Sequence, residues 1–554
     1  MNVSYFIHFT DDPTIASSAS LTKPNVQRGA AMLFATAEFR KLVCTGMLPQ
    51  ERIGKKKTPI CATAYKYMFN ACRIPHHEQD SYRIYDPSRN NHCIVARKGH
   101  FFSIVLVDDD GNALPVTVLE DQLQQCIEFA DRIPSSRPKL GLMTSGNRDE
   151  WAGARDQLLK AGGMAMKDAL EQLESGAILL NLDDEEPISR QECGDLFWTG
   201  GLNSGGNRWF DKSIQIMISN NGKAGGIAEH SMMDGMPVVV YYDYITKVTY
   251  AEAKRRSRTG PYSVPIVRDI FSEPLGLVDV SLVEALETAG EKHFLFVDLD
   301  STMCVVSFRF SMYFFRAAWN AFNKLITNHV LHVQSFQGFG GSFIKKAGYP
   351  PDAFVQMAMQ LATYRLFGEQ AGTYEATQVR SFLHGRTETT RSVSAESEAF
   401  VKVMGLRPRK DEHDPQILNR KLSLLKDATK SHSKYAALAS QGRGVDRHLL
   451  GLSMLVQRGE AMPSLYSNPV FVRSKRWRVS TSQLTHPRFA LWGYGEVVPD
   501  GVGLAYSVLP RSCVFNITAL REHGWTDKLA ELLEEALLEM RSLVEASQRP
   551  SSKL

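Results

Sequence analysis

A histidine and an aspartate four residues apart, His230 and Asp234, are the residues of this sequence best suited to acid–base chemistry. They lie in Glu229-His-Ser-Met-Met-Asp-Gly235, whose glycine allows the tight turn that would bring the carboxylate towards the imidazole. An imidazole can take a proton from a hydroxyl or a thiol when a neighbouring acceptor fixes its tautomer. On this stretch alone a structural, hydrogen-bonding histidine is the commoner outcome, so a catalytic His230 needs support from the rest of the chain.

The residues before His230 predict a β-hairpin. Isoleucine alternates with glutamine, methionine and serine over residues 214–219, which is the pattern of a strand with one buried face. Asn221-Gly222 is a strong hairpin-turn signal, and the chain then returns through Ile227. His230 is therefore expected in a loop at the end of a strand, where catalytic groups are often held.

Glycines and lysines further along the chain suggest a phosphate-binding segment. Residues 338–346 are rich in glycine and end in Lys345-Lys346, just before Asp352 and a predicted helix. Such a segment can anchor the phosphates of a nucleotide-like group. The alternative is a flexible loop with surface lysines.

A second downstream set of polar residues could bind a carboxylate. Tyr374 and Thr387 lie in hydroxyl-rich segments, and Arg447 precedes an apolar run. An arginine matches a carboxylate with two parallel hydrogen bonds. The segment Ser480-Thr-Ser-Gln483 adds hydroxyls that could stabilise an oxyanion.

The composition excludes several other classes of protein. The net charge of the 554 residues is only +4, so no nucleic-acid-binding surface is indicated. No apolar run reaches the roughly 18 residues of a membrane span, and the eight cysteines show no C-x-x-C spacing. The sequence lacks G-x-S-x-G, the P-loop motif and H-E-x-x-H. We expect neither a bound metal nor a permanently bound cofactor.

The alternation of apolar patterns indicates an α/β or α+β protein with two domains. Strands are expected at 101–107, 177–182, 237–242 and 294–299, and helices at 31–48, 119–133, 312–334, 351–368, 416–440 and 526–546, the last with Thr526 as N-cap. We predict an N-terminal domain over 58–305 and a C-terminal domain over 306–554. Residues 1–57 are expected to pack partly on the second.

Eight ordered motifs resemble those of the choline/carnitine acyltransferase family. The resemblance extends from about residue 30 to about 545, and its motifs are Asn207–Lys212, Glu229–Gly235, Pro351–Ala362, Thr373–Glu375, Gly385–Ser392, Asp446–Leu452, Ser480–Gln483 and Val497–Gly501. It implies two domains with folds like that of chloramphenicol acetyltransferase, each a mixed sheet flanked by helices, with an active-site tunnel at their interface. It also implies reversible transfer of a short acyl group, such as acetyl, between coenzyme A and the carnitine hydroxyl.

The resemblance assigns a role to each candidate residue. His230 would be the general base, Asp234 would help to order the site, and Ser482 would face the developing oxyanion. The roles implied for the other residues are carnitine binding for Tyr374, Thr387 and Arg447, and coenzyme A binding for Lys345, Lys346, Asp352 and Gln483.

The implied substrates leave two alternatives open. Arg447 and Thr387 favour carnitine over choline, which has no carboxylate. The bulk of Trp492, implied to line the acyl pocket, favours a short chain, with a medium-chain enzyme as the alternative. A non-catalytic protein that binds acyl-CoA or carnitine is the other alternative.

The final tripeptide, Ser552-Lys553-Leu554, matches the address read by the peroxisomal import receptor. A peroxisomal location is therefore expected, with a mitochondrion reached from a longer start, or the cytoplasm, as alternatives. The expected partners are carnitine, acyl-CoA and the import receptor, without nucleic acid, and the protein is expected to be a monomer.

Overall fold

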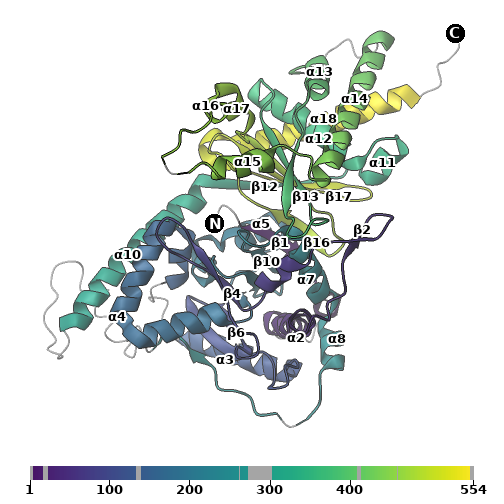
Figure 1. Cartoon of the computed structure of the whole chain (residues 1–554). Helices are drawn as coiled ribbons and strands as arrows, with labels where there is room; N and C mark the ends of the chain where they lie inside the picture. Colours follow the sequence, from purple (N-terminus) through teal and green to yellow (C-terminus); the bar gives the residue numbers. More distant parts are fainter. Residues whose placement is uncertain are drawn as a thin grey trace. The chain divides into compact units, whose positions relative to one another are not determined.

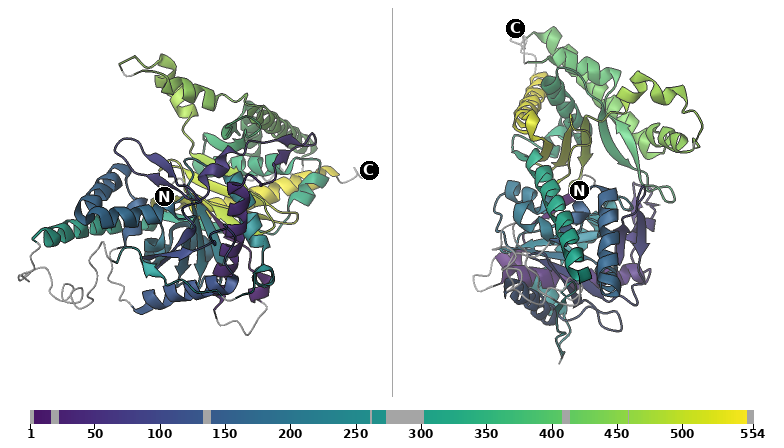
Figure 2. Two further views of the ribbon diagram at one scale, coloured as in Figure 1. Left: turned by 60° about the horizontal axis from the view of Figure 1, so that its bottom comes forward. Right: turned by 90° about the vertical axis from the view of Figure 1, so that its left-hand side faces the viewer.

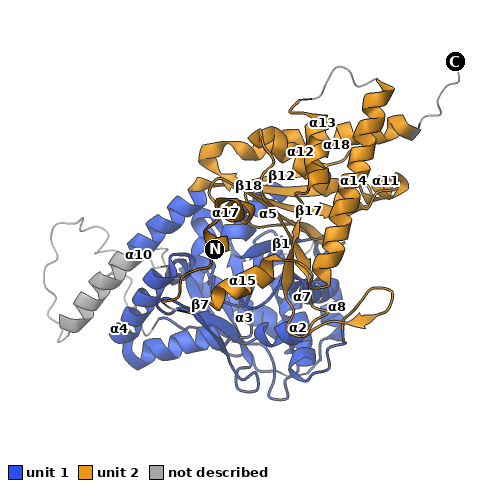
Figure 3. Ribbon diagram, turned by 45° about the horizontal axis from the view of Figure 1, so that its top comes forward, with its two compact units in different colours: residues 1, 3–50, 62–327 blue, residues 2, 51–61, 328–554 orange. Residues whose placement is uncertain are grey.

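The computed structural model, drawn in Figure 1, divides the chain into two compact units, which Figure 3 colours separately. Unit 1 contains the described residues of Val3–Gln50 and Ala62–Thr327, and unit 2 those of Glu51–Cys61 and Asn328–Leu554. The boundary between the units therefore lies at 327/328. The boundary predicted from the sequence is at 305/306. The structure describes residues 4–16, 23–132, 139–260, 262–272, 302–407, 414–457 and 459–548. The strand predicted at 294–299 and the tripeptide Ser552–Leu554 lie outside these residues.

Unit 1 is built on a mixed β-sheet. Strands β6, β8 and β9 are parallel, and the other neighbours are antiparallel. The strands of unit 1 follow the order β11 (Arg268–Asp269), β7 (His100–Val105), β6 (His92–Arg97), β8 (Leu179–Asp183), β9 (Ile214–Ser219), β10 (Ala224–Ala228), β1 (Tyr5–Phe9).

The helices of unit 1 flank this sheet and pack on one another, with α2 against α3 and α7. They are α1 (Pro13–Ala16), α2 (Pro24–Cys44), α3 (Val116–Arg132), α4 (Arg148–Ser175), α5 (Arg190–Thr199), α6 (Gly201–Ser204), α7 (Gly235–Lys247), α8 (Tyr250–Arg256) and α10 (Thr302–Asn328). A separate two-stranded pair joins β4 (Ala71–Ile74) to β5 (Ser81–Ile84).

The hairpin predicted before His230 is confirmed, since β9 and β10 pair in antiparallel register around Asn221-Gly222. Gly222 adopts a φ of +80°, which the turn requires and glycine tolerates. The prediction of a single buried face was wrong, because every residue of both strands is buried. On β10, the Phe197 ring of α5 lies against Gly225, and the Tyr242 ring of α7 lies against Gly226. Successive strand residues face opposite sides, so helices cover both faces.

Unit 2 contains a second mixed sheet. Strand β13 runs parallel to β15, and β15 parallel to β17, while the remaining pairs are antiparallel. The order is β12 (His329–Phe336), β18 (Cys513–Leu520), β17 (Val502–Val508), β15 (Val479–Gln483), β13 (Thr373–Gln378), β14 (Thr387–Arg391). Strand β16 (Phe489–Gly493) contacts β17 and β18, and β2 (Arg52–Ile53) pairs with β3 (Thr58–Pro59).

Two long helices, α12 and α18, pack together in unit 2 and bury the apolar core against its sheet. Figure 2 shows the second, in yellow, leading to the C-terminal end of the chain. The helices of this unit are α11 (Gly341–Lys346), α12 (Pro351–Phe367), α13 (Ala395–Met404), α14 (Pro415–Ser440), α15 (Asp446–Met454), α16 (Ser464–Ser467), α17 (Pro469–Ser474) and α18 (Trp525–Gln548).

Several local predictions were wrong. The apolar run 237–242 forms part of helix α7, because a short buried run has no periodicity that separates helix from strand. The helix predicted over 312–334 ends at Asn328, and β12 follows. Thr526 lies inside the first turn of α18, which begins at Trp525. Strand β1, at Tyr5–Phe9, was not predicted.

The predicted α/β class with mixed sheets flanked by helices is confirmed. Within the part of the chain that the structure describes, none of the helices has the combined length and apolar character of a membrane-spanning helix.

Candidate active site

His230 lies in the six-residue loop between the end of β10 and the start of α7. Its Nδ1 is 2.9 Å from the carbonyl oxygen of Met233 and 3.7 Å from a carboxylate oxygen of Asp234. Because a carbonyl oxygen only accepts hydrogen bonds, Nδ1 carries the proton in the neutral imidazole, and Nε2 holds the basic lone pair. The side chain is 39% exposed, and the Tyr5 ring meets the imidazole edge-on at 5.3 Å between centroids.

The carboxylate of Glu229, one residue before His230, holds this loop in shape. It accepts hydrogen bonds from the backbone N–H of Ser231, at 3.1 Å, and from the Ser231 hydroxyl, at 2.6 Å. The Glu229 backbone N–H donates to the carbonyl of Ser213 at 3.0 Å. The loop is thus tied on both sides of His230.

Arg73, on strand β4, compensates the buried charge of Glu229. Its guanidinium lies 3.3 Å from the Glu229 carboxylate and 3.0 Å from Asp211, and the side chains of both acids are almost completely buried. Burial by itself would lower the pKa of Arg73, but the charges of Asp211 and Glu229 outweigh it, so the pKa is raised. Trp151 donates its indole N–H to Asp211, at 2.8 Å.

Sequence reasoning missed this group. Glu229 stands inside a quoted motif but received no role, and Asp211 likewise falls within Asn207–Lys212. Arg73 lies more than a hundred residues away in a segment without a motif, so no local signal identifies it.

In unit 2, three of the predicted residues come together. The Arg447 guanidinium donates to the Tyr374 hydroxyl at 3.2 Å and to the Thr387 hydroxyl at 3.3 Å, and its Nε donates to the Thr387 carbonyl at 3.2 Å. Tyr374 lies on β13, Thr387 begins β14, and Arg447 is in the first turn of α15. The two strands pair, but Tyr374 lies opposite Arg391 and Thr387 opposite Gln378, so the two hydroxyls are joined through the Arg447 guanidinium and are not direct cross-strand neighbours.

The charge of Arg447 is not balanced by an acid. Among the described residues no carboxylate forms an ion pair with it, and its side chain is exposed. The neighbouring Asp446 instead accepts two bonds from Arg391, at 2.9 and 2.7 Å. The charge of Arg391 is therefore neutralised, while the guanidinium of Arg447 has only neutral partners.

Asp352, which is half-buried, joins the buried Glu375 and His432 in a polar cluster on the other side of β13. Its carboxylate accepts from the Tyr506 hydroxyl at 2.6 Å, and Glu375 is hydrogen-bonded to Nε2 of His432 at 2.6 Å. One side-chain ligand atom from each of Asp352, Glu375 and His432 lies within 4.8 Å of the others. This is the spacing of a metal site, but Glu375 is already hydrogen-bonded to His432 and Asp352 to Tyr506, while the buried Nδ1 of His432 has no hydrogen-bond partner in the described structure.

The surroundings shift the pKa values in this cluster. Burial, which is the largest effect, raises the pKa of Glu375 to about 7, with a further contribution from nearby Asp352. Burial alone would lower the pKa of His432, but its hydrogen bond with Glu375 and the charge of that carboxylate raise it.

The remaining predicted residues of unit 2 occupy several elements. Lys345 and Lys346 are exposed in the last turn of α11, and Ser482 and Gln483 end β15. Gln483 is exposed and donates to Thr485 at 3.2 Å. Trp492, on β16, is buried with 7% exposure, and its indole N–H donates to the Tyr506 carbonyl at 3.2 Å.

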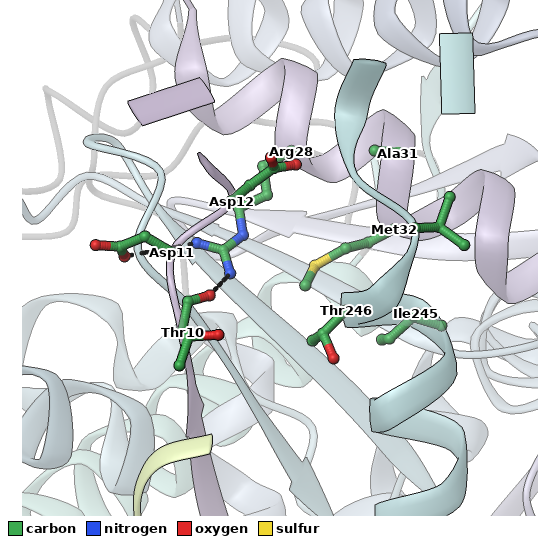
Figure 4. Close-up of a pocket in the computed structure, with 9 residues that line it drawn as sticks. Thr10, Asp11, Asp12, Arg28, Ala31, Met32, Ile245 and Thr246 are labelled. Carbon is green, nitrogen blue, oxygen red and sulfur yellow. Dashed lines mark hydrogen bonds and ion pairs between the residues drawn. The ribbon is translucent and has the colours of Figure 1, made fainter. Parts of the chain in front are cut away.

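A small pocket in unit 1 contains none of these residues (Figure 4). Arg28 extends into it and donates to the carbonyls of Thr10 and Gly222, both at 2.6 Å. Burial lowers the pKa of Arg28 to about 10. The guanidinium is fixed by the protein itself, so this pocket is not the candidate site.

The family model of choline/carnitine O-acyltransferases matches residues 1–535. This chain belongs to the choline/carnitine O-acyltransferase family. A carnitine O-acetyltransferase of Columba livia is 29% identical over 538 residues, which cover 95% of this chain and 78% of the relative. The mitochondrial carnitine O-acetyltransferase of Saccharomyces cerevisiae is 30% identical, and the match covers 100% of this chain and 77% of the relative.

Choline O-acetyltransferases are similar at the same level. That of Sus scrofa is 30% identical over 508 residues, which cover 89% of this chain and 72% of the relative. The protein is thus an acyltransferase of this family, and overall identity does not distinguish the two acceptor alcohols. The recognition made from the ordered motifs is confirmed.

Proposed function

We propose that this protein is a carnitine O-acetyltransferase that moves an acetyl group reversibly between coenzyme A and the carnitine hydroxyl. The observation that carries the proposal is the exposed guanidinium of Arg447, which has hydroxyl and carbonyl partners but no ion-pair partner among the described residues. Carnitine carries a carboxylate, which an arginine can bind through two parallel bonds, whereas choline carries none.

In this proposal His230 is the general base. Its Nε2 takes the proton of the carnitine hydroxyl as the alcohol oxygen attacks the thioester carbonyl, forming a C–O bond and a tetrahedral oxyanion. When the C–S bond breaks, the imidazolium gives the proton to the thiolate, and acetylcarnitine and free coenzyme A result. The Nδ1 bond to Met233 supports this role because it fixes the tautomer, and Asp234 stabilises the imidazolium.

The other predicted residues complete the proposal. Ser482, at the end of β15, would donate to the oxyanion, where a single donor typically contributes about 100-fold or more in rate. Lys345 and Lys346 would bind the phosphates of coenzyme A, while Asp352 and Gln483 would contact the rest of it.

Substrate choice provides the first test. Thiol release from acetyl-CoA is measured with carnitine, with choline and without an acceptor. The proposal expects release that depends on carnitine and is at least about 100-fold slower with choline, since the charge-assisted bonds to a carboxylate are each worth about 1.5–3 kcal/mol. Faster release with choline would contradict it, and coenzyme A binding without any turnover would indicate a non-catalytic relative.

Acyl length provides the second test, with Trp492 as the proposed wall of the acyl pocket. We expect acetyl-CoA to react faster than octanoyl-CoA, and Trp492→Gly to raise the octanoyl-to-acetyl ratio of kcat/KM by at least about tenfold. Trp492→Phe is the matched control, because it keeps most of the ring volume. A wild-type enzyme that prefers octanoyl-CoA would support the medium-chain alternative.

A further inference from the structure

The Glu229 carboxylate in the loop that carries His230 is paired with Arg73, which lies outside every sequence motif. We propose that Arg73 is a positioning residue for the catalytic base, which neutralises and orients the Glu229 carboxylate and so fixes the loop from which His230 acts. This inference rests on the proposed role of His230. It concerns a residue that would touch neither substrate.

The first step of the argument is that Arg73 and Glu229 are anchored to the same short segment. The backbone N–H of Arg73 donates to the Asp211 carbonyl at 2.9 Å, and that of Glu229 donates to the Ser213 carbonyl at 3.0 Å. The Arg73 guanidinium also binds the Asp211 carboxylate. Backbone hydrogen bonds to residues 211–213 therefore fix the positions of both partners of the ion pair.

The second step is that Glu229 bridges across His230. Its carboxylate accepts both the N–H and the hydroxyl of Ser231, so the bond closes a tight turn with His230 between its ends. The side chain of Glu229 is completely buried, and that of Arg73 is only 13% exposed. Without a cation, a buried carboxylate must protonate or move towards water, because its desolvation costs several kcal/mol. Either change would release Ser231 and let the loop shift.

The third step concerns the size of the effect. A displacement of about 1 Å in a catalytic group can lower the rate by about 100-fold without changing how the substrate binds. Arg73→Met should therefore lower kcat by about that factor. The KM values for carnitine and acetyl-CoA should stay within about threefold, because the loop is not assigned to substrate binding.

Arg148 offers a matched control within the same charge network. It binds Asp211 at 2.8 Å and Asp80 at 2.7 Å, both of which also pair with Arg73, and no ion pair joins it to Glu229 in the described structure. Arg148→Met removes a comparable cation from these acids but leaves the Arg73–Glu229 pair in place. Its kcat should stay within about threefold of the wild type.

A double variant separates positioning from simple loss of structure. Glu229→Gln keeps an acceptor for Ser231 but removes the charge that Arg73 compensates. When it is introduced into Arg73→Met, kcat should rise about tenfold or more, since Glu229 no longer carries an unpaired buried charge. If the two substitutions instead damaged the structure independently, their losses of kcat would add up in the double variant. Arg73→Lys keeps the charge but not the planar fork of the guanidinium, so its kcat should lie between those of wild type and Arg73→Met.

Hydrogen exchange of the full-length protein gives a readout that does not require activity. In Arg73→Met, backbone amides of residues 229–234 should exchange at least about tenfold faster than in wild type, and in Arg148→Met they should not. If the wild type shows no carnitine-dependent thiol release, the proposed function fails, while the exchange result still decides the role of Arg73. Unchanged exchange in Arg73→Met, or equal loss of kcat in both arginine variants, would overturn the inference.

Discussion

In unit 1 His230 follows a fully buried strand, and Glu229 beside it is already paired with Arg73, whose side chain is only 13% exposed. In unit 2 the guanidinium of Arg447 is exposed on a short helix, and its partners are two hydroxyls and a carbonyl. The first region compensates its charges internally, while the second leaves a cationic group uncompensated. A general base needs fixed geometry, whereas a site for an anionic substrate needs an available positive charge.

The same contrast separates two arginines of unit 2, Arg391 and Arg447. Arg391 forms two bonds to Asp446, and Arg447 is the very next residue after that acid. A sequence pattern of charges alone would treat both arginines alike. The different partners make Arg447 the better candidate for a carboxylate ligand.

Replacing the proposed base should have the largest effect. His230→Gln keeps a similar size but cannot accept and return a proton near neutral pH, so we expect kcat to fall by about 1,000-fold, within the usual range for a general base. Steady-state thiol release measures it, and thermal unfolding of the variant should match wild type because the side chain is partly exposed. Retention of more than about a tenth of the activity would assign the base elsewhere.

Replacing the unpaired cation should have the next largest effect, confined to one substrate. Arg447→Met should raise KM for carnitine about 100-fold and leave KM for acetyl-CoA within about twofold, because a charge-assisted bond is worth about 1.5–3 kcal/mol. Arg447→Lys should give an intermediate KM, since it keeps the charge without the fork.

Arg473 is the control for this variant, because it is also exposed in unit 2 but is paired with Glu369 at 2.8 Å. Arg473→Met should leave both KM values unchanged. Equal effects on carnitine and acetyl-CoA in Arg447→Met would show that the arginine acts on the fold and not on the acceptor.

The hydroxyls beside Arg447 should have smaller effects. Tyr374→Phe and Thr387→Val each remove one neutral hydrogen-bonding group of about 1 kcal/mol, so each should raise KM for carnitine by about three- to tenfold. The Tyr374→Phe effect should largely disappear in an Arg447→Met background, because the hydroxyl acts through the guanidinium. Full additivity in this double-mutant cycle would contradict a shared site.

Much of the architecture could be predicted from local patterns. The hairpin before His230 follows from its Asn221-Gly222 turn, and helices α12, α14 and α18 follow from regular apolar spacing. Residues 237–242 could not be assigned by pattern, since a helix buried on most sides and a buried strand have the same composition.

The candidate site likewise contains residues that could be predicted from the sequence and contacts that could not. Tyr374, Thr387 and Arg447 stood in hydroxyl- and arginine-containing motifs, and the structure brings them together. The pairing of Arg73 with Glu229 and of Glu375 with His432 could not be predicted, because each pair joins segments more than fifty residues apart. Such contacts depend on tertiary packing, which leaves no periodic signal in the sequence.

The smallest expected effect is a pH dependence of stability, which comes from Glu375 and His432 on the opposite face of β13 from Tyr374. Successive residues of β13 face opposite sides, so Tyr374 meets Arg447 while Glu375 is buried beside His432 and Asp352. Burial raises the pKa of Glu375 from its ordinary value of 4.5 to about 7, and the bond to that carboxylate raises the pKa of His432. Between pH 4.5 and about 7 the folded pair therefore holds more protons than the unfolded pair.

Stability consequently decreases as the pH rises through this window, because the folded state must release protons that the unfolded state has already lost. Glu375→Gln cannot titrate, so its unfolding midpoint should decrease less than that of wild type between pH 5 and 8. Ser431→Ala, on the same helix as His432 but with its hydroxyl bonded to Glu396, is the control and should keep the wild-type slope. An equal slope in Glu375→Gln would mean that the pair does not titrate in this range, and the stability of this side of β13 would then be insensitive to pH.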